Sequence, residues 1–92
     1  MIEKIIEILE HYGHEAQKLK AVEELTELSE KIIKEVNKGT DTGIGDEIAD
    51  VFIMLTQLEL IYDIDPFETR ERIEYKLDRQ IERIRNGKEE RN

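Results

Sequence analysis

The sequence predicts an all-α fold, a four-helix bundle-like domain, and three features of the chain support this prediction. Apolar residues recur at helical spacing in four segments, and no segment reads as a strand. Glycines and the single proline fall between these segments, where helices begin or end. Charged residues make up 40% of the chain and aromatic residues 5%, which suits helices with one solvated face. The chain, residues 1–92, is therefore expected to form one domain with a small core.

The first two helices are predicted over residues 2–11 and 14–38. Isoleucines and a leucine recur at helical spacing in the first segment, and Gly13 ends it. The second segment carries an apolar stripe made of Leu19, Val22, Leu25, Ile32, Ile33 and Val36. Gly39 is a suitable C-terminal stop, because glycine readily adopts the left-handed conformation that ends many helices.

The third and fourth helices follow a predicted loop over residues 39–45. Asp46 is expected to cap the third helix, which extends to about Tyr62. The run Asp65-Pro66-Phe67-Glu68 combines an N-cap residue, proline at the first helical position and an acid at the third. The fourth helix is predicted to start there and to end near Asn86.

Five carboxylates form two sets with helical spacing. Glu23, Glu24 and Glu27 fall within an arc of about 100° on the second helix. Glu47 and Asp50 lie about 60° apart on the third. Like charges held this close raise one another's pKa unless a cation intervenes. Because hard oxygen ligands suit Mg²⁺ or Mn²⁺, the pattern predicts a metal site formed by all five acids.

The third helix is expected to be buried on nearly all sides, because seven of the eight residues 48–55 are apolar. Helix capping accounts for Glu47 but not for Asp50, which lies a full turn further along. The structural alternative for Asp50 is an ion pair with Lys20 or Arg83. On the second helix alone, an ordinary solvated face with i,i+4 ion pairs is the favoured interpretation of the acids.

A di-iron carboxylate site is disfavoured. Such a site requires Glu-x-x-His pairs, and neither of the two histidines, His11 and His14, has a glutamate three residues before it.

The net charge of −9 and the pI near 4.7 narrow the classes of partner. Such a surface repels nucleic acid and anionic membrane, so we expect neither as a partner. A phosphate-bearing ligand remains possible where metal ions invert the local field. We expect a cytoplasmic protein, since the chain has no cysteine, no signal-peptide pattern and no run long enough to span a membrane. The small core favours a homodimer or homotetramer.

The acidic pattern resembles that of the MazG-like nucleoside triphosphate pyrophosphatases, an all-α superfamily. Its signature is Glu-Glu-x-x-Glu, a spacer, and Glu-x-x-Asp, and the five acids match every position with 19 residues between the two sets. Further similar sequence surrounds the motif: Tyr12-Gly13, Gln17, Ala49-Asp50-Val51 and Lys76-Leu77-x-Arg79-Gln80-x-x-Arg83. The resemblance covers roughly residues 11–84.

Membership would imply Mg²⁺-dependent hydrolysis of a (deoxy)nucleoside triphosphate to the monophosphate and pyrophosphate, by an oligomer. Either Glu24 or Glu27 would act as the general base on water. The resemblance also makes a basic stripe on the fourth helix, Lys76, Arg79 and Arg83, a candidate phosphate contact. Gln17 and Lys20 continue the acidic face of the second helix and are candidate nucleotide contacts. For both sets, a solvated surface is the alternative.

Two other functions remain open at this stage. One is hydrolysis of phosphoribosyl-ATP, a substrate that also occurs in the superfamily. The other is a non-catalytic helical dimerisation or adaptor module whose acids form ion pairs. The adaptor differs from the enzymes because it has no need for a divalent metal. The two enzymes differ from each other in their substrate.

Overall fold

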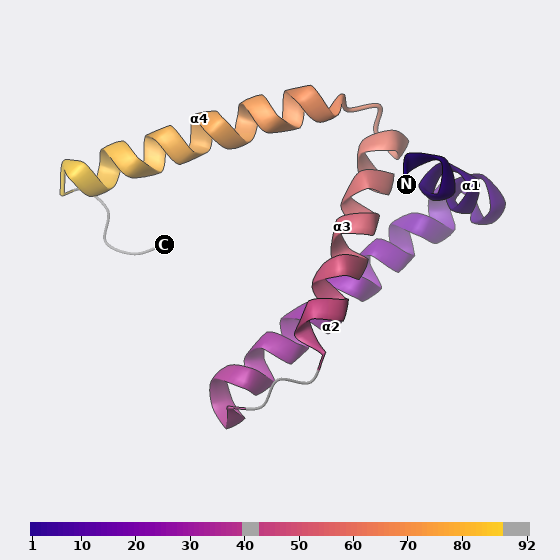
Figure 1. Cartoon of the computed structure of the whole chain (residues 1–92), viewed down its shortest axis with the longest axis horizontal. Coiled ribbons are helices and arrows are strands. Elements are labelled where there is room, and N and C mark those ends of the chain that lie inside the picture. The colour runs from indigo at the N-terminus through magenta and orange to yellow at the C-terminus, as the bar shows by residue number, and fades with distance from the viewer. Residues whose placement is uncertain (40–42, 88–92) are drawn as a thin grey trace.

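A computed structural model describes residues 1–39 and 43–87 of the chain. It contains four helices: α1 (Ile2–Tyr12), α2 (His14–Lys38), α3 (Ile44–Ile61) and α4 (Pro66–Arg85), as Figure 1 shows. No strand occurs among the described residues. The all-helical fold with four helices predicted from the sequence is therefore confirmed.

Glycines end α1 and α2 where the sequence places them. Gly13 adopts φ +91° and donates its backbone N–H to Leu9 O at 2.8 Å, so α1 closes one residue later than predicted, at Tyr12. Gly39 is left-handed at φ +69° and donates to Glu35 O at 2.7 Å. Only glycine adopts such backbone angles at no steric cost, so these two residues fix the ends of the helices.

The predicted start of α3 is wrong. Asp46 is not the cap: Gly43 holds that position at φ +83°, and no side chain caps the helix. The backbone N–H of Glu47 donates to Gly43 O at 3.2 Å, so the left-handed glycine starts the helix before Asp46 is reached. Asp46 instead lies in the first turn, where a negative charge stabilises the helix dipole. The rest of the predicted loop, residues 40–42, lies outside the described residues.

The start of α4 agrees with the prediction. Asp65 Oδ1 accepts a hydrogen bond from the backbone N–H of Phe67 at 2.8 Å, and Pro66 occupies the first helical position. The turn before it is also held by hydrogen bonds, since the N–H of Ile64 donates to Glu59 O at 2.8 Å. The direction in which α4 leaves α3 is therefore defined by local contacts.

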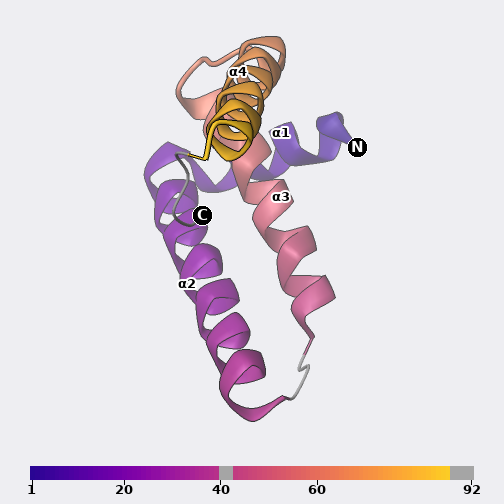
Figure 2. The same ribbon diagram turned by 90° about the vertical axis from the view of Figure 1, so that its left-hand side faces the viewer.

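The packed part of the molecule consists of α1, α2 and α3. α2 and α3 run side by side, and α1 crosses one end of both (Figure 2). The apolar core is small: its buried side chains among the described residues are Ile5, Leu9, Ala21, Val51 and Met54.

α4 stands apart from this core. It extends away from the end of α3, and none of its residues is buried (Figure 1). The radius of gyration is accordingly 16.5 Å, whereas a compact domain of this length has about 12 Å. The apolar side chains of α4 therefore remain in solvent in a single chain.

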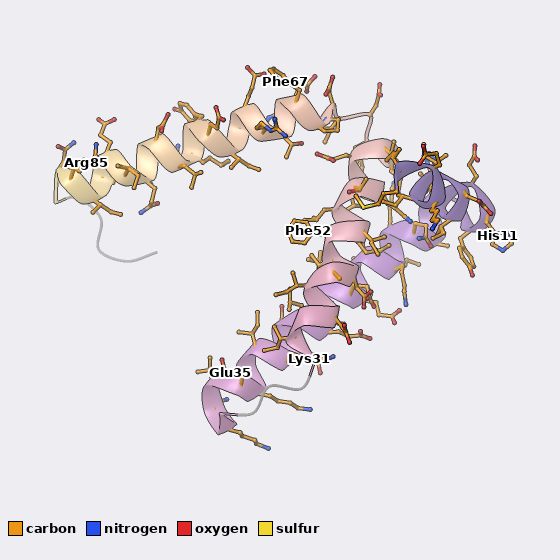
Figure 3. The ribbon with its side chains drawn as sticks, viewed as in Figure 1. His11, Lys31, Glu35, Phe52, Phe67 and Arg85 are labelled. Atoms are coloured by element: carbon orange, nitrogen blue, oxygen red, sulfur yellow. The ribbon has the colours of Figure 1, made fainter. Side chains whose placement is uncertain are left out.

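The expectation that the third helix is buried on nearly all sides is wrong for the single chain. The side of α3 that faces α2 is covered, but the opposite side is not, and Phe52 is 64% exposed. Phe52 projects into the open angle between α3 and α4 (Figure 3). The apolar run of α3 thus has more apolar surface than this chain covers. None of the described helices combines the length and apolarity needed to cross a bilayer.

Candidate metal centre

The five predicted carboxylates gather where α2 meets the first turns of α3. Glu24 and Glu47 are buried, at 6% and 4% exposed, and face each other from the two helices. Glu27 and Asp50 are partly exposed, and Glu23 lies on the solvent side. Helical spacing puts each set on one face of its helix, and side-by-side packing brings the two faces together.

The carboxylates form two groups that share one residue. Ligand atoms of Glu23, Glu24 and Glu27 lie within 4.8 Å of one another, and so do those of Glu24, Glu47 and Asp50. Glu24 therefore stands between two adjacent positions, each of which could hold a cation. Sequence spacing predicted the ligand set, but the sharing of Glu24 follows only from the packing of the helices.

The electrostatics of the group favour a bound positive charge. Burial raises the pKa of Glu24, and the nearby Asp50 carboxyl raises it further. A hydrogen bond with Glu47 raises the pKa of Glu27, with burial and the charge of Glu47 adding to the effect. Without a cation, burial of Glu24 and the hydrogen bond between Glu27 and Glu47, together with repulsion between the negative charges, raise the pKa of both carboxyls above the ordinary 4.5.

One carboxylate oxygen of the cluster has no hydrogen-bond partner within the described residues. Glu47 Oε1 is buried and unpaired, and the residue as a whole is 4% exposed. An unsatisfied buried polar atom costs roughly 1–3 kcal/mol, and more when it is charged. A cation bound between Glu24, Glu47 and Asp50 would satisfy this oxygen.

A lysine neutralises negative charge only at the outer edge of the carboxylate cluster. Lys20 Nζ lies 3.4 Å from Glu23 Oε1 and 3.7 Å from Glu24 Oε1. The hydrogen bond with Glu23 and the charges of the cluster raise the pKa of this lysine. In residues 1–39 and 43–87, no ion pair joins a cation to Glu27, Glu47 or Asp50. The ion-pair alternative for Asp50 therefore finds no partner in Lys20, which binds the neighbouring acids.

The donor set fits a hard divalent cation. All candidate ligand atoms are carboxylate oxygens, and no histidine or thiolate belongs to either group. Mg²⁺ and Mn²⁺ prefer such oxygens, whereas softer metals prefer nitrogen or sulfur. The acidic cluster of Glu23, Glu24, Glu27, Glu47 and Asp50 can thus hold a metal ion.

A buried amide pair, Gln17 and Gln57, lies between α2 and α3 like the acids. We call this row of amides and carboxylates between the two helices the polar seam. Gln17 Nε2 donates to Gln57 Oε1 at 2.6 Å, and Gln57 is fully buried with its own Nε2 unpaired among the described residues. The two glutamines lie seven residues from Glu24 and Asp50, about 10 Å along the helices. They line a hollow of about 580 Å³ that also includes Lys20 and Glu23.

Sequence reasoning missed Gln57. Its signal was available, because Gln57 follows Asp50 by seven residues as Gln17 precedes Glu24 by seven. A seven-residue separation keeps a side chain on nearly the same face of a helix. Two such glutamines on facing helices indicate a continuous polar seam.

The predicted substrate contacts fall into two places. Gln17 and Lys20 line the hollow beside the acids. Lys76, Arg79 and Arg83 lie on α4, which stands away from α2 and α3 (Figure 1). Arg79 there lies over the Tyr75 ring, 5.7 Å from its centre. A single chain therefore does not bring the basic stripe to the acidic cluster.

Comparison with known proteins found no match. No protein-family model, no curated protein and no solved structure matches the chain. A functional proposal therefore depends on the acidic sequence pattern and on the geometry of its residues.

Proposed function

We propose that this protein is a Mg²⁺-dependent nucleoside triphosphate pyrophosphatase, a hydrolase acting on acid anhydrides. It would convert a (deoxy)nucleoside triphosphate to the monophosphate and pyrophosphate. The observation that carries the proposal is the pair of adjacent carboxylate groups sharing Glu24. Two neighbouring cations are a common arrangement for displacement at phosphorus, because they stabilise both the attacking and the leaving oxygen.

The chain's own residues would hold the cations and position water. Glu23, Glu24, Glu27, Glu47 and Asp50 are the ligands, and Mn²⁺ is an acceptable substitute for Mg²⁺. When bound, the metal neutralises phosphate charge and lowers the pKa of a coordinated water. Of the two candidate bases, Glu27 fits better than Glu24, because it belongs to only one group and is partly exposed.

The acidic pattern also implies a protein family, a cellular location and an assembly. The chain would be a MazG-like enzyme of nucleotide metabolism, cytoplasmic, and assembled as a homodimer or homotetramer. The excess of exposed apolar side chains on α3 and α4 supports the assembly. The cysteine-free composition supports the location, because reducing compartments offer no use for disulfides.

The two alternatives remain distinguishable. Phosphoribosyl-ATP would be cleaved by the same carboxylates, so only the substrate separates it from other triphosphates. A non-catalytic adaptor would need its acids paired with cations. The buried, unpaired Glu47 Oε1 argues against that alternative, because ion pairing within the described residues leaves this oxygen unsatisfied.

A pyrophosphate-release screen tests the proposal. The substrates are the canonical ribo- and deoxyribonucleoside triphosphates and phosphoribosyl-ATP, each with Mg²⁺ and with EDTA. Release that requires Mg²⁺ and is lost in Glu47→Gln supports the enzyme. Asp46→Asn is the matched control, because this acid lies in the same helical turn but outside both carboxylate groups. No release from any substrate, with the metal bound, would contradict the proposal.

A further inference from the structure

The hollow of about 580 Å³ beside the carboxylate cluster is lined by a side chain with an unpaired hydrogen-bond donor. Gln57 lines this hollow and is 0% exposed, and its Nε2 makes no hydrogen bond within the described residues. A buried polar group that is left unpaired destabilises the fold, and most such groups in proteins have a partner. Gln57 therefore calls for a hydrogen-bond acceptor.

The contact with Gln17 decides which end of the Gln57 amide still needs a partner. Gln17 Nε2 donates to Gln57 Oε1 at 2.6 Å, so the carbonyl oxygen of Gln57 is already paired. The amide nitrogen of Gln57, which can only donate, is the unpaired end. The hollow thus favours a ligand that carries an acceptor at this position.

The walls of the hollow are mostly apolar. They consist of Ile8 and Tyr12 of α1, Leu19 of α2, and Ile53 and Met54 of α3. Of these five side chains only Met54 is buried, and Tyr12 is 62% exposed. Small-molecule sites typically combine apolar walls with a few fixed polar groups. A flat heterocycle fits both properties, because its faces cover the apolar side chains while its polar edge reaches the amide.

The hollow and the carboxylate cluster share residues. Glu23 lines the hollow and belongs to one of the two carboxylate groups. Lys20 also lines the hollow, and its Nζ lies 3.7 Å from Glu24 Oε1. Gln57 lies farther away, seven residues beyond Asp50 and about 10 Å along α3. A ligand whose phosphates are at the carboxylates can therefore extend along the hollow, so that its far end reaches Gln57.

This order along the hollow determines which atoms of a nucleotide meet Gln57. The ribose lies between the phosphates and the base, so the base reaches the far end of the hollow with the ring edge opposite the ribose. That edge carries the exocyclic group at C4 of a pyrimidine or at C6 of a purine. An oxo group there accepts a hydrogen bond from Gln57 Nε2, whereas an amino group presents N–H groups and leaves the donor unpaired.

We propose that this hollow binds the base of the nucleotide and that the Gln57 amide selects bases with an oxo group at this position, as in uracil, thymine, guanine and hypoxanthine. The amino bases cytosine and adenine are disfavoured. Gln57 is thus a specificity-determining residue, and its hydrogen bond with Gln17 fixes its orientation. The role in substrate choice rests on the proposed function, whereas the binding of a base in the hollow does not require hydrolysis.

Two pairs of triphosphates test the selection on the wild-type protein. UTP and CTP differ in the group at C4, and ITP and ATP differ in the group at C6, each with the accompanying proton on the adjacent ring nitrogen. Both pairs are measured as ribo- and deoxyribonucleotides. Within each hydrolysed pair, kcat/KM for the amino base should be about ten- to a hundredfold lower, because it leaves a buried donor unpaired. Ratios near one, or a preference for the amino bases, would overturn the proposal.

A variant at position 57 links the selection to the amide. Gln57→Met keeps a side chain of similar length without an N–H, so the ratio within each pair should fall to near one. Thr56→Val is the matched control, because Thr56 is the polar neighbour of Gln57 on α3 but does not line the hollow; it should retain the wild-type ratio. Bound water is the alternative partner for Gln57 Nε2, and it does not distinguish between bases. A wild-type ratio in Gln57→Met would therefore contradict the role of the amide.

Nucleoside binding separates the base site from the hydrolysis. In ¹⁵N-labelled wild type in EDTA, the side-chain amide signal of Gln57 is identified by its absence in Gln57→Met. Uridine should shift this signal and cytidine at the same concentration should shift it much less, and neither carries a phosphate for the acids to repel. Equal shifts, or none, would overturn the proposal. If uridine shifts the signal but no triphosphate releases pyrophosphate, the proposed function fails and the base site stands.

Discussion

Where α2 meets α3, polar side chains leave solvent together, namely Gln17, Glu24, Glu47 and Gln57, whereas along α4 the apolar side chains stay in it. Burial of polar groups is costly unless they find partners, and exposure of a continuous apolar stripe is costly unless it is covered. Both regions therefore depart from what a self-contained helical domain would adopt.

The buried polar groups of the seam and the exposed apolar stripe of α4 call for different kinds of partner. Among the described residues, the seam leaves the carboxylate oxygen of Glu47 and the amide nitrogen of Gln57 unpaired. The oxygen calls for a cation, and the amide N–H calls for a hydrogen-bond acceptor. α4 leaves a line of branched aliphatic side chains uncovered, so it calls for another apolar helix. A bound ion would complete the seam, whereas a second apolar helix would complete α4. The following experiments test the two regions separately.

The largest effect is expected for Asp50→Asn at the seam. The substitution preserves shape but removes the charge of a ligand in the inner carboxylate group. We expect kcat to fall by about 10²-fold or more, similar to the effect of removing one key electrostatic group from other active sites. Steady-state pyrophosphate release measures it.

The same variant should fold normally, and without metal it should be at least as stable as wild type, because one of the repelling charges is gone. Circular dichroism and thermal melts in EDTA check this. Turnover equal to wild type would mean that Asp50 has only a structural role.

Metal should stabilise the seam and leave the packing of α4 largely unaffected. A ligand present at about 100 times its Kd adds roughly 2.7 kcal/mol to the free energy of unfolding. For a domain of this size, that corresponds to a rise in Tm of the order of 10 °C. Thermal melts with millimolar Mg²⁺ and with EDTA measure the difference.

The control is Glu47→Gln, which removes the residue whose oxygen is unpaired. In this variant the two melting curves should nearly coincide. Coincident curves for wild type would exclude a Mg²⁺ site of useful affinity.

On α4, removal of basic side chains should affect substrate and not the fold. Lys76 and Arg79 are exposed, so truncating either should change stability by no more than about 0.5 kcal/mol. Each charge-assisted hydrogen bond to phosphate is worth about 1.5–3 kcal/mol, so its removal should lower kcat/KM by roughly ten- to a hundredfold. A rise in KM alone would indicate ground-state binding, and a fall in kcat would indicate charge stabilised during cleavage. Steady-state kinetics on Lys76→Ala and Arg79→Ala separate the two.

The matched control is Arg72→Ala, a cation on the same side of α4 that pairs with Glu68 at 3.7 Å. It should retain wild-type kcat/KM. If Lys76→Ala and Arg79→Ala also retain it, the stripe is a solvated surface and the carboxylate site acts without it.

The ends of the helices could largely be predicted from the sequence. Local signals were sufficient for the helix ends at Gly13, Gly39 and Asp65, because each acts through its own backbone or side chain. Asp46 failed as a cap because Gly43 starts the helix first, and two candidate start signals within three residues cannot be ranked from spacing alone.

The packing of the helices against one another could be predicted from the sequence only in part. Helical spacing placed each acidic set on one face, but the shared position of Glu24 depends on how α2 and α3 pack. The apolar run that contains Phe52 was predicted to be buried, but the pattern does not say whether the same chain covers it. For this reason the sequence predicted burial of α3, and the single chain leaves one side open.

The smallest effect is a pH dependence confined to the seam. The folded state raises the pKa of Glu24 and Glu27 above 4.5, so it binds more protons than the unfolded chain between 4.5 and the raised values. The free energy of unfolding must therefore fall as pH rises through that window. In EDTA, the Tm should be highest at mildly acidic pH and decrease towards neutrality, and thermal melts at a series of pH values measure this.

Two comparisons assign this slope to the seam. Mg²⁺ should flatten it, because the cation replaces the protons that relieve repulsion between Glu27 and Glu47. Glu27→Gln should also flatten it in EDTA, whereas Glu30→Gln, at an exposed acid of α2 outside both carboxylate groups, should not. α4 contributes no carboxyl to either group, so Leu77→Glu should change the Tm itself while the change in slope with Mg²⁺ persists. If the Mg²⁺ effect disappeared in Leu77→Glu together with the assembly, the carboxylate site would depend on a second copy for its formation.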